Sequence, residues 1–135
     1  MIELPIWITT DRFEVTTPSD HFINPRCFGE DFAKWLAPRL ESNGLPTSDP
    51  LQEDWGWLLL VDHAGFRFGL SIGVMEASLG VVPADWRVGV EYSRFTNSLR
   101  HWFKPEPFEL LQDVPARVRS ILEAEPAFRL LEREP

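Results

Sequence analysis

The sequence holds few of the residues that mark several common classes of protein. Cys27 is the one cysteine among 135 residues, so no disulfide can form within the chain, and a reducing, cytoplasmic compartment is expected. The longest aliphatic run is Leu58-Leu59-Leu60-Val61, far below the ~20 residues of a membrane helix. Near the N-terminus, Glu3 stands where a signal peptide would carry lysine or arginine. These features predict an intracellular protein that does not enter a membrane.

Positive charge is also scarce. The chain has 13 lysines and arginines against 21 acidic residues, a net charge of -8. Nucleic-acid binding depends on neutralising phosphates with cations, so a nucleic-acid partner is not expected. No lysine or arginine occurs between Arg39 and Arg67. The acids within this stretch are Glu41, Asp49, Glu53, Asp54 and Asp62. They form either a solvated face or a docking patch for a basic partner.

Apolar residues are plentiful enough for a folded core. They make up 44% of the chain, and there are 6 tryptophans and 10 phenylalanines, which is too hydrophobic for a disordered acidic chain. A chain of this length buries about two-thirds of its surface on folding. No repeats, low-complexity tracts or linkers divide the sequence. We therefore expect residues 1–135 to form a single domain that needs no disulfide or metal.

The N-terminal half begins with strand and helix patterns. Apolar residues alternate with other residues along 2–8 and again at 13–15, which predicts extended structure in both segments. A turn at 10–12 would join them into a hairpin. Pro5 cannot donate to a neighbouring strand, so this strand is expected at an edge of the sheet. A helix is predicted to begin near Asn24-Pro25 and to end at Ser42-Asn43-Gly44.

Three further strands are expected over 55–61, 66–74 and 86–92, with a turn at His63-Ala64-Gly65. Residues 94–107 read as irregular, and a second helix is expected to begin at Asp113. Residues 127–133 fit either a strand or a helical turn. The fold class that this order predicts is α+β, a mainly antiparallel sheet of about four to five strands with two helices packed on one face.

Catalytic patterns are missing from the sequence. The glycines between 65 and 73 lie inside strand patterns, whereas a phosphate-binding loop joins a strand to a helix. His21, His63 and His101 do not share the spacing of a metal site, and Ser71 has no nucleophile elbow. Cys27 has no assignable histidine partner. We therefore expect no cofactor and no metal, and the sequence favours a non-enzymatic role.

Two candidate binding sites remain. The first is a contact surface for a basic protein, formed by Glu53, Asp54, Trp57 and Asp62, in which tryptophan supplies binding energy and the acids steer association. The second takes a small anionic ligand. It is the pocket of a binding protein or an enzyme, lined by Trp57, Arg67, Arg87 and Glu91, in which the two arginines hold a carboxylate or a phosphate. Arg67, Arg87 and Glu91 share one sheet face with small residues if the strands pair in compatible register. A self-associating structural protein is a third interpretation.

One part of the chain resembles a group of small bacterial proteins. In these, a helix of the form F-G-x-D-x-x-x-W-L precedes a strand that starts E-D-W-G-W. The matching residues here run from Phe28 to Leu36 and from Glu53 to Trp57. The resemblance implies a compact bacterial α+β domain and brings no activity or catalytic residues with it. In general character, a small acidic domain of this kind is similar to immunity proteins, which neutralise a toxin by covering its site.

Overall fold

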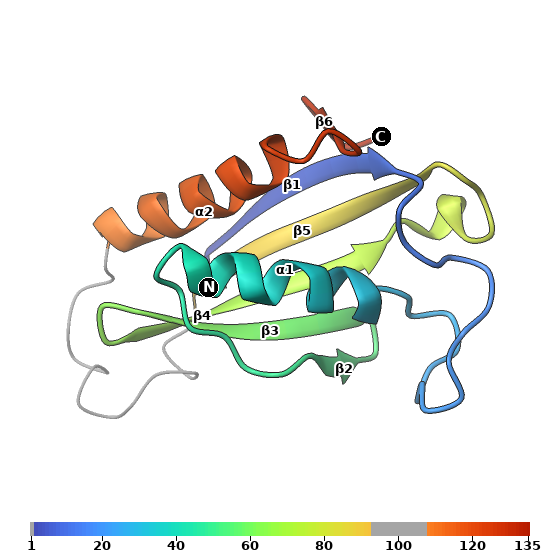
Figure 1. The fold of residues 1–135 in the computed structure, drawn as a ribbon, viewed down its shortest axis with the longest axis horizontal. Helices are drawn as coiled ribbons and strands as arrows, with labels where there is room; N and C mark the ends of the chain where they lie inside the picture. The colour runs from blue at the N-terminus through green and yellow to red at the C-terminus, as the bar shows by residue number, and fades with distance from the viewer. Residues whose placement is uncertain (1, 93–107) are drawn as a thin grey trace.

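Six strands pair into one antiparallel sheet in the order β2-β3-β4-β5-β1-β6 (Figure 1). The structure is a computed structural model that describes residues 2–92 and 108–135. The strands are β1 (Ile2–Thr10), β2 (Leu51–Glu53), β3 (Gly56–His63), β4 (Phe66–Val74), β5 (Ala84–Tyr92) and β6 (Arg129–Leu131). The expected α+β class is therefore confirmed, with a sheet somewhat larger than the expected four to five strands. The expected irregular segment 94–107 lies outside the described residues.

Both helices, α1 (Glu30–Ser42) and α2 (Phe108–Glu123), lie on the same face of the sheet (Figure 1). Alternate strand residues point toward them and are buried, as in Leu70 and Ile72 of β4 and Val88 and Val90 of β5. The core joins these side chains to the buried residues of the helices. The same alternation sends every second strand residue to the opposite face. The face opposite the helices is called here the second face.

Two expectations for the N-terminal segment are corrected. Residues 13–15 form no strand, and β1 pairs instead with β5 and β6. The side chains of Phe13 and Val15 are nevertheless buried, and Phe13 stacks on Phe32 of α1 with ring centroids 4.4 Å apart. The alternation of apolar residues at 13–15 therefore reflects burial of their side chains in the core and not pairing in a strand. β1 lies inside the sheet, between β5 and β6. However, β6 pairs only with Trp7–Thr9 and does not extend to Pro5, so Pro5 still has no paired strand on that side, as expected for a residue without an N–H group.

The helix boundaries also differ from expectation. α1 begins after Gly29, five residues beyond Asn24, and ends at Ser42 close to the expected stop. α2 begins at Phe108 and continues through Asp113. The C-terminal segment, which fitted two interpretations, forms strand β6 beside β1. None of the helices in the described ranges is long and apolar enough to cross a membrane.

Candidate functional site

The turn between β2 and β3 carries the most exposed tryptophan side chain of the described residues. Glu53 and Gly56 pair across this turn, and Asp54 and Trp55 lie at its tip. Glu53 and Asp54 are exposed, and the side chain of Trp55 is 50% exposed. Leu51 pairs with Leu58, so Leu51 and Glu53 point to the second face. The turn therefore presents a large aromatic ring next to two carboxylates.

A neighbouring loop adds a second apolar side chain at this edge of the sheet. The side chain of Gln52 accepts a hydrogen bond from the backbone of Ile23 (2.6 Å) and donates one to the carbonyl of Asn24 (3.1 Å). The Cys27 thiol donates to the carbonyl of Asp54 (3.0 Å). These bonds hold the loop beside β2, where Ile23 is 86% exposed. The surface formed by Ile23, Leu51, Glu53, Asp54 and Trp55 is called here the β2 patch.

Trp57 does not belong to a contact surface, which corrects the sequence expectation. Its side chain is 3% exposed on the helix-covered face, and its indole Nε1 donates to the carbonyl of Cys27 (2.7 Å). Its ring also packs against Phe22, with centroids 5.3 Å apart. Trp57 therefore fastens the loop before α1 to the sheet. The exposed tryptophan of this region is Trp55, two residues earlier on the chain.

Asp62 also lies apart from the other expected partner-binding residues. It lies six positions after Gly56 along β3, a span of about 20 Å in a strand. Its carboxylate forms an ion pair with Arg67 on β4 (3.0 Å), and this hydrogen bond raises the pKa of Arg67. The acids of the 40–66 stretch therefore do not form one patch. Glu53 and Asp54 stay together at the β2–β3 turn.

The alternative ligand site is partly assembled by the strand register. Gly69 pairs with Glu91 and Gly73 with Arg87, so the arginine and the glutamate share the second face. Both line a cavity of about 490 Å³ on that face. Arg67 does not line it, because this residue lies beside Asp62 near the β3–β4 turn. The cavity wall includes Trp55, where Trp57 was expected.

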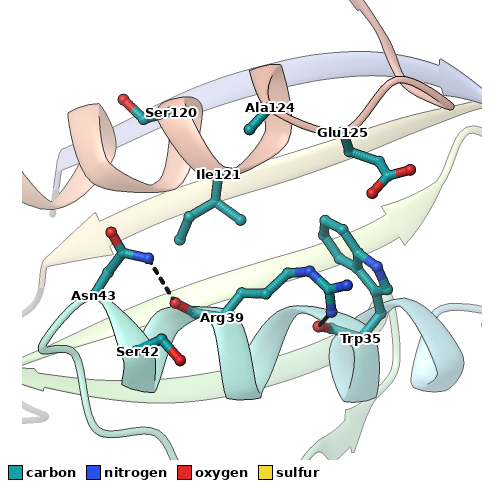
Figure 2. Close-up of a pocket in the computed structure, with 8 residues that line it drawn as sticks. All are labelled: Trp35, Arg39, Ser42, Asn43, Ser120, Ile121, Ala124 and Glu125. Atoms are coloured by element: carbon teal, nitrogen blue, oxygen red, sulfur yellow. Dashed lines mark hydrogen bonds between the residues drawn. The ribbon is translucent and has the colours of Figure 1, made fainter.

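A second concavity, of about 360 Å³, lies between the two helices (Figure 2). Arg39 runs along α1 with its guanidinium over the Trp35 ring (4.1 Å) and donates to the Trp35 carbonyl (2.7 Å). On the opposite side, Ile121 points into the groove from α2. Glu125 forms an ion pair with Arg12. Arg39 is thus engaged with its own helix and Glu125 with Arg12, which makes this groove a weaker candidate for a ligand.

The histidines and the cysteine have structural partners. His21 pairs with Glu30 (2.6 Å) and His63 with Asp113 (2.8 Å); His101 lies outside the described residues. Burial raises the pKa of the Cys27 thiol, and the nearby Asp54 raises it further, so this group is less reactive than a free thiol. Within 2–92 and 108–135, no group of three or more histidine, cysteine or acidic side chains is arranged to hold a metal ion.

The pair between His63 and Asp113 predicts a pH dependence of stability. Partial burial acts to raise the pKa of Asp113, but hydrogen bonds from Arg117 (3.0 Å) and His63 outweigh it and lower that pKa from 3.8. Because the folded state holds the carboxylate more strongly, its contribution is present above pH 3.8 and is lost as the pH falls through the folded pKa. We expect this contribution to be about 0.2–1 kcal/mol, as for exposed ion pairs.

Urea unfolding at pH 7 and at pH 2.5 checks this prediction. Asp113→Asn should lower stability at pH 7 and have no such effect at pH 2.5. The exposed Glu109 on the same helix provides the control, and Glu109→Gln should change stability by less at pH 7. An Asp113→Asn loss of equal size at both pH values would show that the carboxylate charge is not responsible.

Comparison with known proteins identifies no relative of this chain. No protein-family model, no curated protein and no solved structure matches this chain.

Proposed function

We propose that this chain is a non-enzymatic, cytoplasmic binding protein that docks a basic protein through the β2 patch. The observation that carries the proposal is the gathering of exposed apolar side chains around one sheet edge. Among the described residues, five large hydrophobic side chains are exposed, and Ile23, Leu51 and Trp55 of these belong to the β2 patch. Single exposed apolar residues are common, whereas apolar residues grouped inside a polar rim are typical of interaction sites.

Trp55 is the expected anchor of the contact. Tryptophan is among the residues that most often dominate the energy of a protein interface, because its large ring loses much water-exposed surface on binding. The anchor is held on a rigid support, since Gly56 continues directly into β3. A rigid anchor loses little conformational entropy when the partner binds.

The charges beside the anchor select the kind of partner. Glu53 and Asp54 are exposed, and the whole chain carries a net charge of -8. Such a field accelerates association with a basic surface and repels an acidic one. A basic toxin, neutralised by this chain as its immunity protein, is the partner that the general character of the molecule favours.

Photo-crosslinking in the cells that naturally express this protein tests the proposal. A photoreactive benzoyl-phenylalanine placed at Trp55 or Leu51 should form a crosslink to one protein, which mass spectrometry identifies. The same group at Ala116, exposed on α2 at the far side of the sheet, is the matched control. Crosslinking of the same protein at Ala116 with equal yield, or no crosslink at either position of the β2 patch, would contradict the proposal.

Affinity measurements with the crosslinked partner then distinguish the contribution of Trp55 to binding from that of Glu53 and Asp54. Trp55→Ala should weaken binding about 30-fold, the effect of losing a hot spot of about 2 kcal/mol. Reversing both acids, Glu53→Arg with Asp54→Arg, should slow association and reduce its salt dependence. Asp62→Asn, at the other end of β3, should change neither. Unchanged salt dependence in the double variant would exclude electrostatic docking at this patch.

A further inference from the structure

Two further large apolar side chains are exposed at the end of the sheet where the β2 patch lies. Val81 and Val82, in the loop between β4 and β5, are 50% and 61% exposed. Because β3 and β4 are antiparallel, this loop follows β4 at the end where the β2–β3 turn leads into β3. The turn also reaches the end of β4, since a Cβ built on Gly73 would lie 3.2 Å from the carbonyl oxygen of Trp55. The five exposed large apolar side chains of the described residues are therefore gathered at one end of the sheet.

A hollow of about 310 Å³ lies between the segment that carries Ile23 and the loop that carries Val81. Figure 1 shows both segments, the chain from β1 to α1 and the chain from β4 to β5, beyond the same end of the sheet. The hollow is lined by Val15, Thr16, Pro25, Arg26, Phe28, Leu79 and Gly80. Val15 and Phe28 are buried, so the base of the hollow is apolar. Its volume is at the lower end of the range of binding pockets, which suits one large side chain.

Hydrogen bonds hold the walls of the hollow in place. The Gly80 N–H donates to the carbonyl of Val15 (2.8 Å), and the Val81 N–H donates to the carbonyl of Ser78 (3.0 Å). Ser78 is buried, and its hydroxyl accepts a hydrogen bond from the N–H of Asp85 near the start of β5 (2.9 Å). The β4–β5 loop is therefore tied both to the sheet and to the segment before α1. A contact surface held in this way loses little conformational entropy when a partner binds.

Acidic side chains lie around this apolar region. Glu14 is exposed next to the hollow, and its carboxylate accepts a hydrogen bond from the N–H of Thr16 (3.3 Å). Arg26 brings a positive charge to the wall, but it forms an ion pair with the exposed Glu76 (3.5 Å). The two acids of the β2 patch add further negative charge. Such a rim disfavours a second copy of this chain, which carries a net charge of -8, and favours a basic protein.

From these features we infer that the basic partner of the β2 patch also contacts Val81 and Val82 and places one large apolar side chain in the hollow. The inference rests on the docking function proposed above and deepens it, because it gives the interface a second apolar anchor. The partner expected from this arrangement is a protein that presents an apolar side chain within a basic surface. Its apolar side chain would be buried at the centre of the contact, and its basic groups would meet the acidic rim.

Photo-crosslinking from the β4–β5 loop tests whether the partner reaches it. Benzoyl-phenylalanine at Val82 should crosslink to the same protein that is captured from Trp55. Capture from Trp55 alone would overturn this inference and leave docking at the β2 patch intact. A crosslink from Val82 to a second copy of this chain, or to a different protein, would also overturn it. No crosslink from either position or from Leu51 would contradict both proposals.

Filling the hollow tests the second anchor itself. Thr16 is exposed at its rim, so Thr16→Trp should occupy the hollow and weaken binding of the crosslinked partner about tenfold. Thr17 is exposed but does not line the hollow, and Thr17→Trp, the matched control, should leave the affinity unchanged. Val81→Ser with Val82→Ser should weaken binding by a similar factor at unchanged thermal stability. Unchanged affinity in Thr16→Trp, where Trp55→Ala weakens binding, would overturn this inference and not the docking function.

Discussion

Replacement of Trp57 by alanine is expected to lower the free energy of unfolding by about 3–5 kcal/mol, the usual cost of removing a buried aromatic side chain. The indole is 3% exposed, and its Nε1 donates to the Cys27 carbonyl (2.7 Å). The variant loses the packing against Phe22 and also leaves that carbonyl without its donor. Urea unfolding followed by circular dichroism measures the change.

Two further variants separate packing from hydrogen bonding and from surface effects. Trp57→Phe keeps a ring but has no N–H group, so we expect a smaller loss, of which about 1–3 kcal/mol reflects the unpaired carbonyl. Trp55→Ala, at the half-exposed position two residues away, should cost less than about 1 kcal/mol. A Trp55→Ala variant less stable than Trp57→Ala would mean that the two tryptophans have been assigned to the wrong environments.

Replacement of Gly56 by alanine should destabilise the protein more than replacement of Gly65 by alanine. Gly56 has a φ of +155°, a value that residues with a side chain rarely adopt. A Cβ at this position would lie 2.3 Å from the carbonyl oxygen of Ile72. The neighbour is backbone inside the sheet and cannot turn away as a side chain would. Backbone strain and overpacking together are expected to cost about 3 kcal/mol or more.

Gly65, in the β3–β4 turn, is the matched control for this variant. It also has a positive φ, +82°, but no atom lies within 4 Å of a Cβ built on it. Gly65→Ala therefore reports the conformational cost alone, about 1–2 kcal/mol. Thermal unfolding of both variants distinguishes the two contributions. Equal losses of stability in Gly56→Ala and Gly65→Ala would show that the close approach of the new Cβ to the Ile72 carbonyl oxygen adds nothing to the cost of the Gly56 substitution.

The regular strands could be predicted because each of them carries its own pattern. In 66–74 the apolar residues alternate with Arg67, Gly69, Ser71 and Gly73, and the structure places these two sets on opposite faces. The same reasoning holds for β5, so the shared face of Arg87 and Glu91 was predictable. Strands β2 and β6 have three residues each, too few for an alternation to be recognised.

Two acidic residues have partners in the structure that their predicted roles did not include. Asp113 was predicted to cap a helix, yet it lies within α2 and pairs with His63 at the end of β3. Asp62 was assigned to a contact surface. The turn at Ala64-Gly65 places it opposite Arg67, and the short hairpin loop was a signal that could have identified this pair.

By itself, the sequence determined the α+β class, the net negative charge and the side chains that share a face within each long strand. These properties depend on composition and on the two-residue period of a strand. Only the tertiary structure decided between Trp55 and Trp57. In β3 both faces are apolar, since Leu58 and Leu60 alternate with Leu59 and Val61, so periodicity assigns neither face to the core. The packing of the helices and the fold of the β2–β3 turn buried one tryptophan and exposed the other.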